Sequence, residues 1–129
     1  MSRYQYDCRV RFSDVDAYGH VNNVKYFEYY QEARLAFLSS LGSGEGDFEL
    51  VVARVEVDYK RPILFRTEPY TVDTWVIRVG GSSFTLGSEF RDGAEVLSRA
   101  ETVLVTFDSQ GQTSRALREV ERERLLSQT

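Results

Sequence analysis

Apolar and polar residues alternate strictly over the first part of the chain. The apolar positions are Tyr4, Tyr6, Cys8, Val10 and Phe12, and polar residues stand between them. A period of two residues is typical of a strand with one buried face. The pattern therefore predicts a strand over residues 4–12, which the mostly polar run 13–19 ends.

The next segment changes to a helical period. Between residues 23 and 41, apolar side chains recur at three- and four-residue intervals and form one wide stripe. The stripe comprises Tyr26, Phe27, Tyr30, Ala33, Phe37, Leu38 and Leu41. Asn22 or Asn23 can cap the first turn, and Gly42 suits the left-handed residue that ends a helix. We therefore predict a helix of about five turns, followed by a flexible connector over 42–47.

The rest of the chain alternates again and predicts strands over residues 51–60, 70–79, 83–91 and 94–107. Gly80-Gly81 marks one tight turn, and Asp92-Gly93 is a dipeptide favoured in type I′ hairpins. The charged segment 114–126 is expected to form a short helix or a frayed tail. This order predicts an α+β fold in which about five antiparallel strands wrap around one long helix. The uncovered sheet face is expected to be solvated or paired with another subunit.

Length and composition narrow the function. A chain of 129 residues fits one domain, expected over residues 1–129. One cysteine and one histidine exclude an internal disulfide and the usual zinc site. A net charge of -4 without a basic block argues against nucleic acid. Polar N-terminal residues and short apolar runs predict no secretory segment and no membrane span, so we expect a cytoplasmic protein.

The chemistry concentrates in residues 14–26, DVDAYGHVNNVKY. The chain carries no nucleophile elbow, dinucleotide fingerprint or P-loop. Here a strand leads through a loop to a helix N-terminus, whose free N–H groups can hold a developing oxyanion. Asp14 or Asp16 could attack a carbonyl or deprotonate water, and His20 could orient that water or move a proton. The alternative is a polar turn that only caps the helix.

Residues 11–38 closely resemble the start of hotdog-fold acyl thioesterases of the 4-hydroxybenzoyl-CoA thioesterase type. The residues that match this signature are Phe12, Asp14, Asp16, Gly19, His20, Val21, Asn22, Asn23, Tyr26, Glu32, Ala33 and Arg34. Downstream, Tyr59, Arg61 and Pro62 match a Y-x-R-P motif, and Gly81-Ser82-Ser83 resembles the G-x-S turn that follows it. The likeness covers essentially the whole chain and implies a hotdog fold.

The resemblance also implies roles for residues in the loop. Asp16 stands at the position of the catalytic carboxylate, as nucleophile or general base, while Asp14 holds the loop by hydrogen bonds. The backbone amide near Asn23 corresponds to the donor that polarises the thioester carbonyl. His20 matches a residue that is catalytic in the plant acyl-ACP branch, although Tyr18 replaces the asparagine of that branch.

The implied reaction is hydrolysis of an acyl-CoA or acyl-ACP thioester without a metal or cofactor. The expected substrate contacts are Gly19, Val21, Asn22, Tyr26, Lys60, Arg61, Ser82 and Ser83. Lys60, Arg61 and Arg66 form the best cationic cluster for coenzyme A, with Arg78 and Arg91 as further candidates. Some relatives carry basic residues where this chain has Gly80-Gly81-Ser82, which leaves open an acyl-ACP substrate or a coenzyme A bound by few charged contacts.

The resemblance further implies a homodimer or a homotetramer with active sites at the dimer interface. The rival interpretations are a hotdog enoyl-CoA hydratase and a non-catalytic acyl-binding protein. Some relatives use a helix glutamate, so Glu28 and Glu32 are weaker catalytic candidates. Cys8 alternates with inward-facing residues and is expected to be a small core residue.

Overall fold

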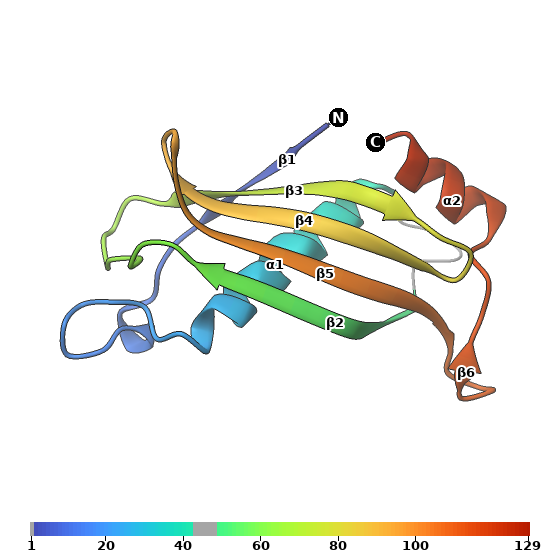
Figure 1. The fold of residues 1–129 in the computed structure, drawn as a ribbon, viewed down its shortest axis with the longest axis horizontal. Coiled ribbons are helices and arrows are strands. Elements are labelled where there is room, and N and C mark those ends of the chain that lie inside the picture. The colour runs from blue at the N-terminus through green and yellow to red at the C-terminus, as the bar shows by residue number, and fades with distance from the viewer. Residues whose placement is uncertain (1, 43–48) are drawn as a thin grey trace.

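An antiparallel sheet curves around one long helix in the computed structural model, which describes residues 2–42 and 49–129 (Figure 1). The elements are β1 (Tyr4–Cys8), a 3-10 turn (Phe12–Asp14), α1 (Lys25–Ser40), β2 (Leu50–Tyr59), β3 (Tyr70–Val79), β4 (Ser83–Asp92), β5 (Glu95–Asp108), β6 (Thr113–Ser114) and α2 (Glu119–Leu126). The predicted α+β class and the sheet wrapped around a helix are confirmed. The predicted connector lies mostly outside the described residues.

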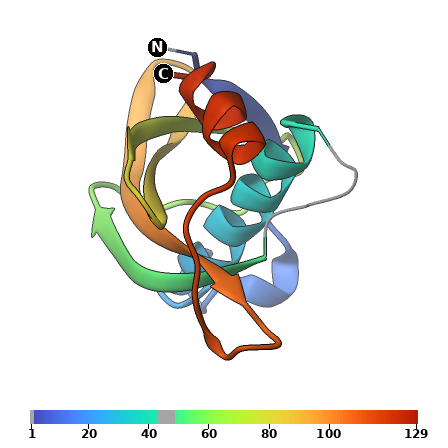
Figure 2. The same cartoon turned by 90° about the vertical axis from the view of Figure 1, so that its right-hand side faces the viewer.

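The strands follow the order β1-β3-β4-β5-β2, and the short β6 adds to β5. All pairings are antiparallel. β1 and β2 are therefore the two edges of the main sheet. Helix α1 lies against the concave face, as the end-on view in Figure 2 shows, while α2 packs against β3.

The core forms between α1 and the concave face of the sheet. The buried residues of α1 are Tyr26, Tyr29, Tyr30, Ala33, Arg34 and Phe37. Most of them belong to the predicted stripe, but Phe27 is 41% exposed, and the buried Tyr29 and Arg34 were not predicted. Tyr30 donates its hydroxyl hydrogen to Ser98 Oγ at 2.8 Å, so this buried phenol keeps a hydrogen-bond partner.

The first strand is shorter than predicted. It ends at Cys8, and the 3-10 turn Phe12–Asp14 leaves Phe12 76% exposed instead of buried. The physical reason is local: the Arg11 N–H donates to the Tyr29 hydroxyl at 3.0 Å, and the Asp14 N–H donates to the Arg11 carbonyl at 3.0 Å. These bonds take the main chain away from the sheet and direct it into the loop before α1.

The turn between β4 and β5 also differs from its prediction. Asp92 pairs with Glu95, so Gly93 and Ala94 are the two central residues. Of these two, only Gly93 has a positive φ, of 59°. A type I′ turn needs a positive φ at both central residues, whereas type II′ needs it only at the first. The turn is therefore of the II′ pattern.

The charged C-terminal segment forms a helix because its charges are paired. Glu121 is 1% exposed and accepts bonds from two Arg115 nitrogens at 2.8 Å, from Arg118 Nη2 at 3.0 Å and from the Arg118 N–H at 2.8 Å. Burial alone would raise the pKa of Glu121. The hydrogen bonds from Arg115 and Arg118 outweigh burial and lower the pKa to about 2. A buried network of this kind fixes α2 to the chain that precedes it.

Acid should therefore lower the free energy of unfolding through protonation of Glu121. Because its folded-state pKa lies below the usual 4.5, its stabilisation is present above pH 4.5 and is lost as the pH falls towards 2, by about 3 kcal/mol in total. Urea unfolding at pH 7, 5, 4 and 3 should show a steeper loss of unfolding free energy for the wild type than for Glu121→Gln. Exposed Glu119→Gln in the same helical turn is the control. Equal pH dependence of the wild type and Glu121→Gln would contradict this assignment.

Candidate active site

Residues 15–21 form a tight turn at the end of the molecule where α1 begins. Val15 pairs with Val21, the Asp16 N–H donates to the His20 carbonyl at 2.8 Å, and the Gly19 N–H donates to the Asp16 carbonyl at 3.0 Å. Gly19 has a φ of 77°, in the left-handed region that favours glycine. The polar run in the sequence is thus an ordered turn with Asp16 at its first corner.

The turn is fastened to the chain that follows β2. The Val21 N–H donates to the Ile63 carbonyl at 2.8 Å, and the Phe65 N–H donates to the Gly19 carbonyl at 3.0 Å. His20 and Leu64 pair between these two bonds. This short ladder joins two segments that are far apart in the sequence.

Asp14 holds the turn from the side of the helix. Its side chain is 4% exposed, and Oδ2 accepts bonds from the Tyr29 hydroxyl at 2.6 Å and from Arg11 Nε at 2.7 Å. Its carbonyl accepts the Asn22 N–H at 2.9 Å. Burial raises the pKa of Asp14, but the bonds from Tyr29 and Arg11 outweigh burial and lower it. The carboxylate is therefore committed to internal bonds.

Asp16 divides its two carboxylate oxygens between different environments. Oδ1 accepts the main-chain N–H groups of Tyr18 at 2.8 Å and of His20 at 3.1 Å. Oδ2 accepts no hydrogen bond from another residue in the part of the chain that the structure describes. The His20 N–H is the main cause that lowers the pKa of Asp16, so this exposed carboxyl is ionised at neutral pH. One oxygen secures the turn, and the other has no partner among the described residues.

The main-chain N–H groups before α1 are nearly all bonded. The Asn22 N–H donates to Asp14, the Val24 N–H to Asn22 Oδ1 at 3.0 Å, and the Lys25 N–H to the Asn22 carbonyl at 2.9 Å. The predicted Asn22 or Asn23 cap is wrong, because Val24 is the N-cap and no side chain caps it; Asn22 Oδ1 instead closes a turn three residues before α1 begins. Within residues 2–42 and 49–129, the Asn23 N–H has no acceptor. A free donor therefore remains at the positive end of the helix dipole.

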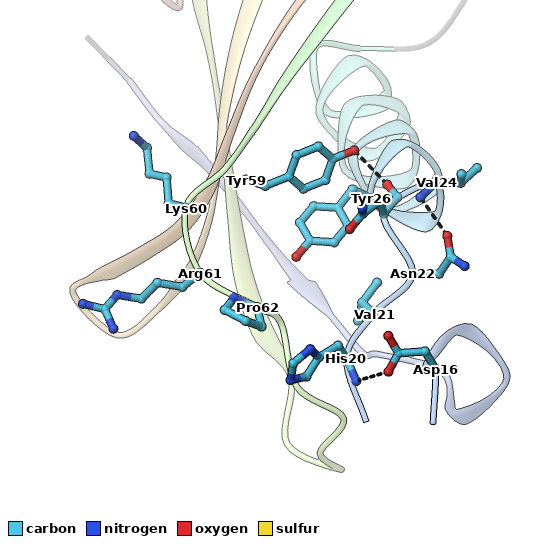
Figure 3. Close-up of a pocket in the computed structure, with 11 residues that line it drawn as sticks. Asp16, His20, Val21, Asn22, Val24, Tyr26, Tyr59, Lys60, Arg61 and Pro62 are labelled. Atoms are coloured by element: carbon cyan, nitrogen blue, oxygen red, sulfur yellow. Dashed lines mark hydrogen bonds between the residues drawn. The ribbon is translucent and has the colours of Figure 1, made fainter. Parts of the chain in front are cut away.

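A hollow of about 500 Å³ brings most of the predicted site together (Figure 3). The predicted residues that line it are Asp16, His20, Val21, Asn22, Asn23, Tyr26, Lys60 and Arg61. Gly19 lies in the turn next to this hollow. Ser82 and Ser83 lie in and after the β3–β4 turn, at the opposite end of the sheet (Figure 1). One chain does not bring these serines to the hollow, and their contact with substrate stays a prediction.

Tyr59 is a site residue whose role the sequence did not reveal. It ends β2, and its hydroxyl donates to the Asn23 carbonyl at 3.0 Å. Its ring meets Tyr26 edge-on, with 4.7 Å between the ring centroids. Tyr59 therefore joins the end of β2 to the peptide that follows the free Asn23 N–H. The Y-x-R-P motif was the only signal that could have singled it out.

His20 contributes its main chain to the turn and its ring to the hollow. The bond to Asp16 Oδ1 ends on the His20 main-chain N–H, and the imidazole points away from the Asp16 carboxylate (Figure 3). Among the described residues, the imidazole has no hydrogen-bond partner. The ring is free to meet a water molecule or a substrate atom in the hollow.

The predicted cationic cluster is mostly engaged elsewhere. Arg66 pairs with Asp92 at 3.0 Å and lies over the Tyr70 ring, and Arg91 pairs with Asp73 at 2.8 Å. Arg61 Nε contacts Glu95 Oε2 at 3.1 Å, but both side chains are exposed. Lys60 forms no ion pair within the described part of the chain. Lys60 and Arg61 are thus the cations that the hollow offers to an anionic substrate.

The weaker catalytic candidates lie outside this hollow. Glu28 pairs with Lys25 at 2.7 Å and with Arg11 at 3.2 Å. Glu32 lines a separate hollow of about 260 Å³ beside Cys8. Burial raises the pKa of the Cys8 thiol to about 12, as expected for an inert core residue.

Neither a metal cluster nor a membrane span emerges from the described residues. No group of three or more metal-binding side chains gathers within 2–42 and 49–129. No helix in these ranges is long and apolar enough to cross a membrane.

The fold and the loop define an α+β hotdog protein with a polar site at a helix start, and comparisons with known proteins agree. The model of the thioesterase-like superfamily matches residues 10–125. The long-chain acyl-CoA thioesterase FadM of Escherichia coli is 28% identical over 127 residues, which cover 94% of this chain and 96% of FadM. The chain belongs to the thioesterase-like superfamily.

Two further relatives extend this comparison. The uncharacterised protein YsmA of Bacillus subtilis is 37% identical over 79 residues, which cover 60% of this chain and 53% of YsmA. The match therefore spans about half the length of YsmA. A thioesterase from Thermus thermophilus, solved with coenzyme A and zinc, is 32% identical, with a TM-score of 0.84. That match covers 95% of this chain and 91% of the Thermus chain.

Proposed function

We propose that this protein hydrolyses acyl-CoA thioesters, with Asp16 and the Asn23 N–H as its reacting groups. The observation that carries the proposal is the arrangement of these two groups. Asp16 and Asn23 line the same hollow, and among the described residues Asp16 Oδ2 and the Asn23 N–H lack partners while their neighbours are bonded. A donor aimed at a carbonyl oxygen and an oxygen base or nucleophile are the two requirements of acyl transfer to water.

Two routes use these groups. In the first, Asp16 Oδ2 bonds to the carbonyl carbon, the C–S bond breaks, and water then hydrolyses the mixed anhydride and restores the carboxylate. In the second, Asp16 takes a proton from a water molecule whose oxygen attacks the carbonyl carbon; the C–S bond then breaks, and the leaving thiolate takes up the proton that Asp16 releases. Both yield the free acid and the thiol. The low pKa of Asp16 keeps it ionised for either route and also makes it a weaker base.

The hollow and the relatives favour coenzyme A as the carrier. Lys60 and Arg61 line the hollow and can meet the phosphates of a polyanionic carrier. FadM acts on long-chain acyl-CoA, and the Thermus thioesterase was solved with coenzyme A. An acyl-carrier protein remains the alternative carrier. The reducing cytoplasm is part of the proposal, because the single cysteine is a buried free thiol.

We propose that Asp16→Asn removes the reacting carboxylate but keeps the fold of the turn. An asparagine Oδ1 can still accept the N–H groups of Tyr18 and His20, but the neutral amide neither attacks nor deprotonates water. We expect kcat for thiol release, followed with a thiol-reactive dye, to fall at least about a hundredfold. Asp16→Ala should lose the same activity and, in addition, about 1 kcal/mol of unfolding free energy. Near-normal turnover of folded Asp16→Asn would rule out the assignment.

The imidazole of His20 is proposed to orient water or to move a proton, which is a supporting role. His20→Ala keeps the main-chain N–H that binds Asp16, so the turn should stay intact. We expect kcat to fall by about tenfold, less than for Asp16→Asn. Thermal unfolding should match that of the wild type. Wild-type kcat across the pH range 5–9 would reduce His20 to a structural residue.

We further propose that two copies join through β2. This edge strand has no second strand partner among the described residues, and its Val51 and Val52 are exposed. Nearby, Arg34 is buried; among the described residues its one hydrogen-bond partner is the neutral Thr102 Oγ1, at 3.4 Å, and burial lowers the pKa of Arg34. An open edge with exposed apolar side chains favours pairing with a second sheet.

Light scattering should therefore give two or four times the 14.9 kDa of one chain. Val52→Glu places a charge on the proposed contact and should shift the mass towards one chain. Val120→Glu, on the exposed side of α2, is the matched control and should leave the mass unchanged. A single-chain mass for the wild type at micromolar concentration would refute this assembly.

A further inference from the structure

A second hollow also has Asp16 in its lining. Its volume is about 610 Å³, and Gly19 of the same turn lines it as well. The remaining lining residues are all apolar or aromatic: Phe12, Val15, Ala17, Tyr18, Leu64 and Phe65. Asp16 is the residue that lines both hollows. The two hollows differ sharply in chemistry, because the first contains Lys60, Arg61 and His20.

The apolar lining is exposed to a degree that is unusual for such side chains. Phe12 is 76% exposed, Tyr18 83% and Leu64 51%, and they lie around one hollow. The Phe12 and Phe65 rings meet edge-on, with centroids 5.4 Å apart. Single exposed apolar residues are ordinary, but a contiguous group with a hollow marks a binding surface.

We propose that this second hollow binds the acyl group of the thioester and selects bulky apolar acyl chains. This inference rests on the proposed hydrolysis at Asp16. A thioester carbonyl carbon is trigonal, so its two substituents, the acyl chain and the sulfur of the carrier, point in different directions. A reacting carboxylate between two hollows therefore assigns one hollow to each substituent. The polar, cationic hollow suits the thiol carrier, and the aromatic hollow suits an acyl group of several carbons or an aromatic ring.

Hydrogen bonds to main-chain groups of residues 19, 64 and 65 hold the wall of the second hollow in place. The side chains that would contact the acyl group take no part in these bonds. The Phe65 N–H donates to the Gly19 carbonyl, and the Tyr70 hydroxyl donates to the Leu64 carbonyl at 2.6 Å. Truncating the Leu64 or Phe65 side chain leaves these bonds in place. Substitutions here can therefore change the fit of the acyl group without dismantling the Asp16 turn.

The test compares acyl groups on one carrier. Thiol release from acetyl-, octanoyl- and benzoyl-CoA gives kcat/KM for the wild type, Leu64→Ala and Phe65→Ala. We expect the wild type to prefer octanoyl- or benzoyl-CoA over acetyl-CoA by at least about tenfold. Either variant should lower that preference by about tenfold, because a hydrophobic pocket discriminates by its apolar contacts. Leu35→Ala, on the exposed side of α1, should keep the wild-type preference.

Each other outcome overturns a defined part of the proposal. Thiol release with the same preference in the wild type and both variants, or a wild type that prefers acetyl-CoA, removes the acyl subsite and leaves the hydrolase. No thiol release from any of the three substrates removes the hydrolase and the subsite together. Light scattering completes the set: an altered mass with an equal loss for all three substrates shows that the hollow is a contact between copies.

Discussion

The main-chain ladder between residues 19–21 and residues 63–65 is the constraint on which the site depends. It fixes the Asp16 turn against the chain that follows β2, through the Val21–Ile63 and Phe65–Gly19 hydrogen bonds. Because the donors and acceptors are backbone groups, the ladder leaves the side chains of both segments available. Residues of this ladder line both hollows: His20 and Val21 line the polar hollow, and Gly19, Leu64 and Phe65 line the apolar one.

Around the ladder, some polar groups are bonded within the protein and others remain available to a substrate. Asp14 lies two residues before Asp16 and is buried. Its carboxylate accepts hydrogen bonds from Tyr29 and Arg11. In Asp16, by contrast, only Oδ1 accepts hydrogen bonds, and these come from main-chain N–H groups of its own turn. Tyr59 and Asn22 both bind the Asn23–Val24 peptide, Tyr59 at its carbonyl and Asn22 at its N–H, and neither of them uses the Asn23 hydrogen. The same loop thus leads into the helix and leaves Asp16 Oδ2 and the Asn23 N–H without partners among the described residues.

The sequence predicted best what depends on neighbouring residues. The helix, the four later strands and the gathering of Asp16, His20 and Asn23 follow from local patterns and from one continuous motif. Tyr59 and Phe65 reach the site only through tertiary pairing, so no local pattern could place them there. Phe12 continued an alternating pattern, but hydrogen bonds from Arg11 and Asp14 turned the chain out of the sheet. The alternating pattern of apolar residues cannot show that hydrogen bonds elsewhere in the chain end the strand early.

The central claim is that the Asn23 N–H is held free to bind the substrate carbonyl. Amide NMR of 15N-labelled protein tests it directly, with an octanoyl-CoA analogue in which a methylene group replaces the thioester sulfur and keeps the carbonyl. The Asn23 amide proton should move downfield on binding, while the Val24 and Lys25 protons, already bonded, should move little. Saturated binding with an unmoved Asn23 proton would contradict it.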